Sequence, residues 1–163
     1  MFAFAFELEK DLLPVLEKRI IEISKLPLDV GYFASQGVHE ESGLTYANLA
    51  AIQHKGIAGK MVARRFFDIG LAFKPVKSTS FLKDLNKYLS HLDGKPKISA
   101  MGVMANLGGE YVEVFRNIMG SSMLPDNKPS TIAQKGGRNT PLVDTGDLKA
   151  NMSYRINGVV VTP

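Results

Sequence analysis

The chain has 163 residues, a length that suits one domain spanning residues 1–163 with a sizeable hydrophobic core. It contains no cysteine, which excludes disulfides and thiolate metal sites. The formal net charge is +4, and no apolar run approaches the ~20 residues that a membrane-spanning helix needs.

The first predicted helix covers residues 12–23, where apolar side chains recur at helical spacing after Asp11, a suitable N-cap. Pro27 stops this helix, and residues 28–33 alternate as expected for a strand. The preceding segment, Met1-Phe2-Ala3-Phe4-Ala5-Phe6, has no basic residue before it and acidic residues after it. We therefore expect neither a signal peptide nor a membrane-spanning segment there.

The loop at residues 35–43 contains His39, Glu40 and Glu41. A zinc-protease helix needs a second histidine, which is missing here, so we interpret the three residues as part of a solvated loop.

A short helix is predicted over residues 46–54, because Thr45 is a favoured N-cap and Gly56 occupies the position of a C-terminal glycine. The stretch that follows, residues 62–70, contains a pair of arginines and then a pair of phenylalanines. Arginine and aromatic residues supply most interface hot spots, although at least one of these phenylalanines should belong to the core.

Two further helices are predicted from their apolar spacing, one over residues 80–92 with Ser80 as its cap and a longer one over 98–119. The longer helix contains Gly108 and Gly109, each of which costs about 1 kcal/mol of helix propensity, so we expect a kink or a close crossing at that point. The methionines in its apolar stripe are interpreted as core residues.

Residues 120–141 are rich in glycine, proline and basic residues and contain one predicted helical turn at 130–135. A loop of this length in a small domain is usually functional or mobile, so we expect the segment to be mobile.

The C-terminal part is predicted to form a β-hairpin. Residues 152–156 alternate as a strand, Asn157-Gly158 is the preferred pair for a type I′ turn, and residues 159–161 supply the return strand. The fold class expected from all these elements is α+β, with a small antiparallel sheet packed against several helices.

Asp144-Thr145-Gly146 is also the tripeptide that carries the catalytic carboxylate of aspartic proteases. Fewer than twenty residues follow Gly146, too few for the remaining strands and flap of such an enzyme. We keep an Asp144-dependent protease as a minor hypothesis and otherwise expect no enzyme, no catalytic residues, no metal and no cofactor.

Charge is unevenly spread along the chain. Residues 1–54 carry a net charge of −4, residues 55–77 carry +5, residues 78–127 are balanced and residues 128–163 carry +3. An acidic front and a basic middle can complement each other between neighbouring copies. A basic nucleic-acid-binding module is the alternative explanation for the middle segment, although it lacks a dense cluster of lysine and arginine with exposed aromatics.

Five stretches together resemble one known group of proteins. They are YANLAAIQHKG (46–56), VARRFF (62–67), PSTIAQKG (129–136), PLVDTGDL (141–148) and YRI (154–156). Their order resembles that in the small neck or tail-completion proteins of tailed phages, which are related to the head-tail joining and virion morphogenesis proteins. The chain departs from that group where its members usually have His-Glu-Phe-Gly and Ile-Pro-Ala-Arg-Pro-Phe, so the rigid turn made by the two prolines is not expected here.

This resemblance implies a structural virion protein that assembles as a ring, hexameric or dodecameric, between the portal or adaptor and the tail tube or tail terminator. It implies a location in the neck or tail of the virion, in the host cytoplasm during assembly, with no membrane partner and passing contact with DNA in the lumen. The predicted interface residues are Arg64, Arg65, Phe66, Phe67, Lys135 and Arg138.

Overall fold

The computed structural model describes residues 12–73, 75–143 and 146–163. Helices and strands follow in the order α1 (Leu13–Ser24), β1 (Leu28–Gly31), η1 (Ala34–Gln36), α2 (Tyr46–Lys55), α3 (Phe66–Ala72), η2 (Pro75–Lys77), α4 (Thr79–Leu89), α5 (Ala100–Ile118), α6 (Pro129–Gln134), α7 (Asp147–Ala150), β2 (Ser153–Ile156) and β3 (Val159–Val161), where η marks a short 3₁₀ helix. Helices packed against a small antiparallel sheet make an α+β fold, which confirms the predicted class.

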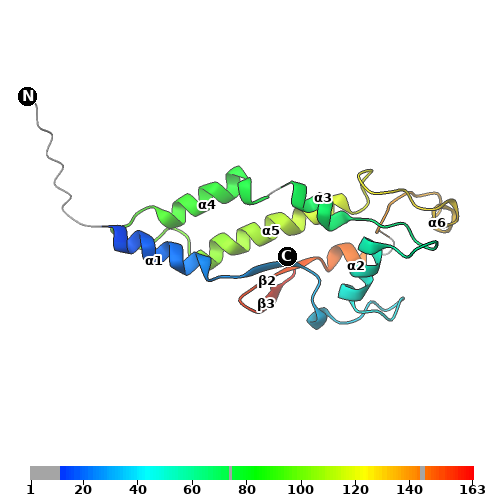
Figure 1. The fold of residues 1–163 in the computed structure, drawn as a ribbon, viewed down its shortest axis with the longest axis horizontal. Coiled ribbons are helices and arrows are strands. Elements are labelled where there is room, and N and C mark those ends of the chain that lie inside the picture. The colour runs from blue at the N-terminus through cyan, green and yellow to red at the C-terminus, as the bar shows by residue number, and fades with distance from the viewer. Residues whose placement is uncertain (1–11, 74, 144–145) are drawn as a thin grey trace, which may run out of the picture.

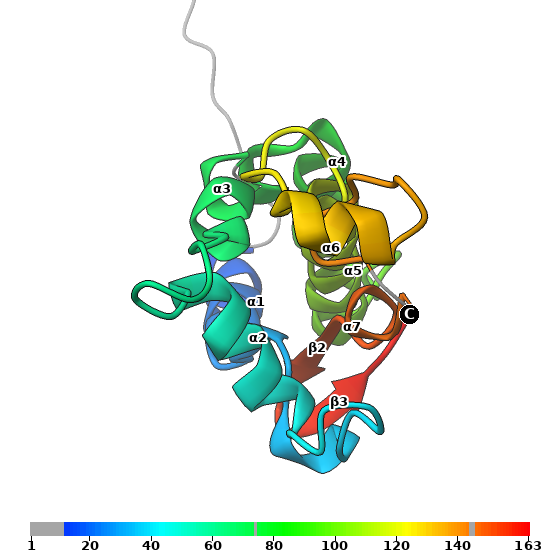
Figure 2. The same ribbon diagram turned by 90° about the vertical axis from the view of Figure 1, so that its right-hand side faces the viewer.

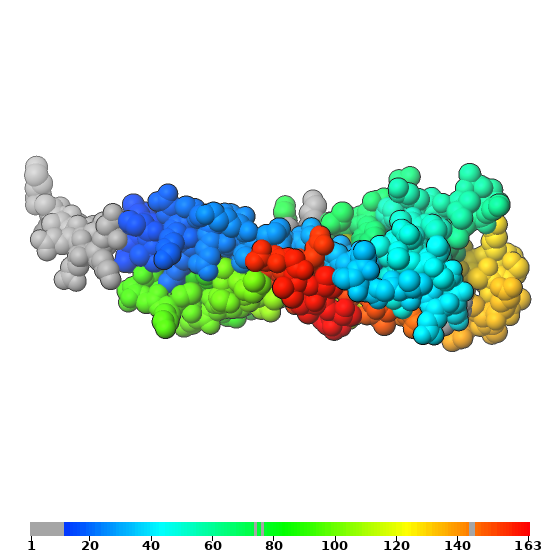
Figure 3. Space-filling model, turned by 90° about the horizontal axis from the view of Figure 1, so that it is seen from below, coloured from blue at the N-terminus to red at the C-terminus, as the bar shows by residue number. Residues whose placement is uncertain are grey.

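The molecule is elongated, and α5 runs along its long axis (Figure 1). Helices α1 and α4 lie side by side at one end, whereas α2, α3 and α6 gather at the other (Figures 1 and 2). The space-filling view shows the same division, with the blue and green segments at one end and the cyan and yellow segments at the other (Figure 3). We call these the α1–α4 end and the α2–α6 end.

The sheet joins β1, β2 and β3 in antiparallel order with β2 in the centre, so that Val30 faces Tyr154 and Tyr154 faces Val161. Asn157 and Gly158 adopt φ angles of 48° and 84°, the positive values that a two-residue type I′ turn requires. The predicted C-terminal hairpin is confirmed.

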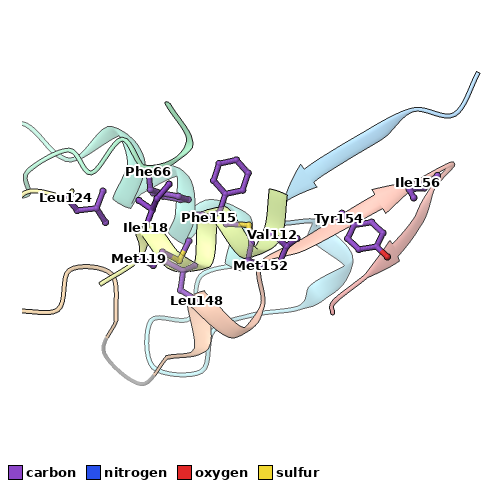
Figure 4. Close-up of a cluster of buried hydrophobic side chains, with 11 residues drawn as sticks. Phe66, Val112, Phe115, Ile118, Met119, Leu124, Leu148, Met152, Tyr154 and Ile156 are labelled. Carbon is purple, nitrogen blue, oxygen red and sulfur yellow. The ribbon is translucent and has the colours of Figure 1, made fainter. Parts of the chain in front are cut away.

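The main core lies between α5, α3 and the inner face of β2 (Figure 4). Its buried side chains include Phe66, Val112, Phe115, Ile118, Met119, Leu124, Leu148, Met152, Tyr154 and Ile156. Each large apolar side chain removed from water contributes roughly 1.5–3 kcal/mol, so this cluster is the principal source of stability.

Helix α5 approaches β2 closely at Gly108. A Cβ atom on this residue would come within 2.6 Å of the Tyr154 ring, which is closer than any side chain allows. The predicted close crossing is confirmed there, whereas Gly109 faces open space. Met101 corrects the prediction that the methionines of α5 are core residues, because it lies on the outer face and is 44% exposed.

The α1–α4 end is held together by a buried arginine. The Arg19 guanidinium, from α1, donates hydrogen bonds to the backbone carbonyls of Tyr88, Ser90, His91 and Gly94 at and after the end of α4. A positive charge at a helix C-terminus is favourable because the last carbonyls of a helix lack intrahelical partners. Tyr88 completes the contact by donating from its hydroxyl to the Arg19 carbonyl at 3.0 Å.

Helix starts differ from the predictions in detail. Thr45 caps α2 as predicted, its Oγ1 accepting from the Asn48 N–H at 3.2 Å. Helix α4 begins after Ser78, not Ser80, because Ser78 Oγ accepts from the Phe81 N–H at 3.0 Å. The predicted cap Asp11 lies outside the described residues.

Candidate interaction site at the α2–α6 end

A cavity of about 360 Å³ opens at the α2–α6 end between α2, α6 and the start of α7. It is lined by His39, Glu41, Leu49, Gln53, Lys60, Met61, Val62, Arg64, Asp126, Asn127, Lys128, Thr131, Lys135, Leu142, Gly146, Asp147 and Leu148. Four of the five stretches that carry the phage-protein resemblance, those within 46–67 and 129–148, contribute to this wall. The fold therefore brings together segments that lie up to a hundred residues apart in the sequence.

Arg64 is the central charged residue of the cavity. Only 9% exposed, it is positioned by its backbone N–H, which donates to the Gln53 carbonyl at 3.0 Å. Its Nη2 donates to Asn127 Oδ1 at 2.9 Å and its Nη1 to Gln53 Oε1 at 3.4 Å. Burial lowers the pKa of the guanidinium from its ordinary value, because the charged form loses hydration.

Two buried hydrogen-bond donors, one on Arg64 and one on Asn127, lack an acceptor among the described residues. Arg64 Nε and Asn127 Nδ2 are both buried, and neither finds an acceptor within the described part of the chain. Arg64 is thus held by two neutral amides and by no carboxylate among these residues. Buried polar groups are normally satisfied, so this guanidinium has unused capacity for an acceptor that enters the cavity.

The neighbouring predicted interface residues divide into buried and exposed positions. Phe66 has no exposed surface, which excludes it from any direct contact with a partner and confirms that one of the pair belongs to the core. Phe67 is half-buried and packs 4.3 Å from Phe66, centroid to centroid. Arg65 is exposed, with its Nη1 4.0 Å from Asp68 Oδ2. Of these residues, Arg65 is the one whose charge is presented to solvent, since Arg64 is buried.

Lys135 and Arg138 lie in the segment after α6. Lys135 Nζ donates to the carbonyls of Thr140 and Val143 at 3.2 and 2.6 Å. This side chain therefore links the end of α6 to the residues that precede α7. Arg138 is exposed and donates from Nε to the Lys135 carbonyl at 3.2 Å. The ends of the segment meet where the Gly120 N–H donates to the Pro141 carbonyl at 2.8 Å. The predicted mobility of residues 120–141 stays a prediction.

His39 was not predicted as part of a site, and its burial corrects the solvated-loop interpretation for this residue, whereas Glu40 and Glu41 are exposed as that interpretation expects. It is 9% exposed, its Nδ1 accepts from the Ser42 N–H at 3.3 Å, and Ser42 Oγ lies 3.1 Å from the same nitrogen. Its Nε2 lies 3.9 Å from Asp147 Oδ2, beyond hydrogen-bonding distance. Although a serine, a histidine and an aspartate are neighbours, Ser42 Oγ also accepts from the Leu44 N–H at 3.4 Å and closes a local turn. We therefore interpret these contacts as stabilising the conformation of the loop, and not as a catalytic triad.

No known family, curated protein or solved structure matches this chain. The resemblance to phage neck and tail-completion proteins therefore stays a prediction.

Glu41, from the acidic front, lines the same cavity as Lys60 and Arg64 from the basic middle, and Asp126 and Asp147 line it too. The cavity wall is therefore mixed in sign, with exposed lysines, Lys60 and Lys128, at its rim. The complementarity of front and middle between neighbouring copies stays a prediction.

Within the described residues, no group of three or more histidine, aspartate or glutamate side chains is placed to hold a metal ion. None of the helices in the described ranges is long and apolar enough to cross a membrane. Asp144, the residue of the protease hypothesis, lies outside the described residues.

Proposed function

We propose that this protein is a structural component of a tailed-phage virion at the head-tail junction. It acts as a neck or tail-completion subunit that assembles as a ring and joins the head or connector to the tail. Its work is done by surface contact and not by turnover of a substrate.

The observation that carries the proposal is the convergence of the resembling stretches on one cavity. Helix α2, the residues around Arg64, helix α6 and the start of α7 are distant in sequence, and all contribute to the same wall. A chance similarity in separate short stretches has no reason to gather at one place, whereas a shared contact surface does. This supports the assignment of the α2–α6 end as the surface that meets other virion proteins.

The chemistry of the cavity supports a protein partner. Its rim offers lysines beside acidic residues, which suits the mixed polar rim of a protein–protein contact, and its apolar wall includes Leu49, Met61 and Leu142. A nucleic-acid-binding groove would instead present cations without interspersed carboxylates. The nucleic-acid alternative therefore gains no support from this site.

The test is a double charge reversal at the cavity rim, Lys60→Glu with Lys128→Glu, introduced into a phage genome that carries this sequence. Both side chains are exposed, and Lys128 Nζ makes a single exposed hydrogen bond to the Lys60 carbonyl, so folding should be preserved. We expect electron microscopy of lysates to show separate heads and tails with a loss of infectious particles.

The matched control is Lys83→Glu with Lys97→Glu, which makes the same charge change at exposed positions in α4 and just before α5, at the α1–α4 end. This variant should give normal tailed particles. Equal yields of joined particles from both variants would contradict the proposed role of the cavity rim. Salt-sensitive binding of the wild-type protein to duplex DNA would favour the nucleic-acid alternative.

A further inference from the structure

A second hollow, independent of the α2–α6 cavity, lies beside β1. It is an apolar groove of about 440 Å³ lined by Leu28, Val30, Phe67, Leu71, Tyr111 and Phe115. Helix α5 forms its floor, α3 one wall and β1 the other. The α5 residues of the groove, Tyr111 and Phe115, lie in the second half of that helix, which Figure 1 shows beside α3.

The groove exposes apolar surface that water disfavours. Leu71 is 57% exposed, and Leu28, Val30, Phe67 and Tyr111 beside it are only partly buried. Exposed apolar side chains gathered along a groove mark a contact surface more often than isolated ones do.

Strand β1 also presents an open edge to this groove. The Asn157 N–H donates to the Pro27 carbonyl at 3.4 Å, and hydrogen-bonded pairs recur at every second residue of an antiparallel ladder. Residues 29 and 31 therefore direct their backbone groups to β2, and the N–H and C=O groups of Leu28 and Val30 point to the outer edge. No strand of the described residues pairs with that edge. An open edge beside an apolar groove is the arrangement that accepts an added strand.

The chain itself contains a segment with the matching pattern. Phe2, Phe4 and Phe6 alternate with Ala3 and Ala5, so an extended backbone places all three rings on one side. We propose that residues 2–6 of one copy add to the outer edge of β1 of a neighbouring copy and insert their phenylalanines into its groove. Five extended residues span about 16 Å, close to the roughly 13 Å of the four-residue β1.

Charge complementarity continues the fit beyond the phenylalanines. Residues 7–11 carry three acids and one lysine, a net charge of −2. Exposed Arg65 immediately precedes the α3 wall of the groove. An added strand whose C-terminal end points toward the start of α3 places its acidic continuation beside Arg65.

The geometry favours a neighbouring copy over the same chain. Leu12 immediately precedes α1, at the far tip of the α1–α4 end, and the 12 residues of α1 cover about 18 Å before the link to β1 begins. The six residue steps from Phe6 to Leu12 reach about 20 Å when fully extended, so only a taut chain would bring Phe6 to the near end of its own β1. Exchange between copies needs no such tension, and it makes a head-to-tail contact, the type of interface from which rings are built.

This inference deepens the proposed ring by naming the contact between copies, and it rests on the proposed function only in requiring that copies associate.

The first test compares two sets of substitutions on opposite sides of the same segment. Phe2→Ser, Phe4→Ser and Phe6→Ser together should raise the concentration at which light scattering detects assembly by at least ~100-fold, since aromatic anchors dominate contact energies. Ala3→Ser with Ala5→Ser, on the other side of the strand, should assemble as the wild type does.

Thermal unfolding of both variants checks that the fold is intact, because the substituted residues lie outside the described core. Assembly of the triple phenylalanine variant at wild-type concentrations would overturn the proposal. Loss of assembly in both variants would overturn the one-sided insertion on which it depends.

The second test locates the segment directly and uses the absence of native cysteine. A Phe4→Cys chain and a longer, tagged Leu71→Cys chain are mixed and oxidised, and the expected product is a mixed disulfide dimer. The control partner carries Val159→Cys on β3, at a residue with similar exposure of 65% against 57% for Leu71. A mixed dimer no more abundant than the control, or closure within one chain when both cysteines are in the same polypeptide, would overturn exchange between copies.

The virion role and the exchange of residues 2–6 between copies can be contradicted independently of each other. Normal joining of heads and tails by the phenylalanine variant would remove the exchanged segment and leave the virion role standing. A confirmed mixed disulfide in a protein that is found in no phage particle would remove the virion role and leave the exchanged segment standing.

Discussion

The two ends of the molecule each contain a buried arginine, and the two arginines are satisfied to different degrees. Arg19, at the α1–α4 end, is 6% exposed and donates to four backbone carbonyls. Arg64, at the α2–α6 end, is 9% exposed, yet its side chain reaches only two amides and keeps its Nε unpaired in the described part of the chain. The two arginines are buried to a similar extent but differ in their hydrogen bonds. Arg19 makes a completed structural contact, whereas Arg64 keeps a donor for an additional acceptor.

The surroundings of the two arginines reinforce this difference. Around Arg19 the chain closes on itself, because the Tyr88 hydroxyl lies 3.0 Å from both the Arg19 carbonyl and Glu22 Oε2, two acceptors that share its single proton. Burial and the nearby Glu22 carboxylate raise the pKa of Tyr88 to about 12, so its hydroxyl stays a donor at neutral pH. Around Arg64 the chain leaves an open cavity. The α1–α4 end thus completes a contact within the chain, whereas the α2–α6 end keeps buried donors that the proposed partner could use.

The largest predicted effect is on Arg19. Arg19→Met should lower the free energy of unfolding by about 3–5 kcal/mol, because a buried cation is removed and four carbonyls lose their donor. Urea denaturation followed by circular dichroism measures this loss, with Lys18→Met, at the exposed neighbouring position, as the control near zero. A loss below 1 kcal/mol would remove the structural role given to Arg19.

Arg64→Met should cost less, about 1–2 kcal/mol, because two amide partners are freed beside a cavity that can admit water. The same denaturation measurement applies, with exposed Arg65→Met as the matched control. If Arg64→Met proved as destabilising as Arg19→Met, the contrast between the two ends would fail.

Asp84 gives the α1–α4 end a pH dependence. Its carboxylate accepts from Lys87 Nζ and from Asn106 Nδ2, each at 2.7 Å, and these two hydrogen bonds hold the pKa of Asp84 below its ordinary value. A depressed pKa in the folded state stabilises the fold above the ordinary carboxyl pKa, and this contribution is lost as the pH falls through the folded value.

Asp84→Asn should therefore cost about 1 kcal/mol near neutral pH, and the cost should shrink between roughly pH 5 and pH 3. Urea denaturation of both proteins across this range measures the difference. A gap that stays constant or widens toward acid pH would show that Asp84 is not stabilised as a carboxylate.

Local signals in the sequence were sufficient for several elements. Thr45, Asn157-Gly158 and Gly108 each fix a conformation through their own chemistry, and the α2 cap, the hairpin turn and the close crossing all follow from that. Helix α3 was not predicted, because seven residues are too few to establish a period.

The partners of the buried arginines could not be predicted. Arg19 looks like a solvated helix residue because the carbonyls that receive it come some seventy residues later. Arg64 looked like a surface cation for the same reason, since Asn127 joins it from a loop 63 residues away. The candidate site was thus predicted as a set of segments, and only the fold could show which side chains face the cavity.

Electron cryomicroscopy of phage particles whose genome carries this sequence is the most direct test of the account. We predict that the images will show a ring of elongated subunits at the junction of head and tail, with the α2–α6 end of each subunit against a neighbouring virion protein. Particles that join and infect without this chain, or particles in which its density lies elsewhere, would contradict it.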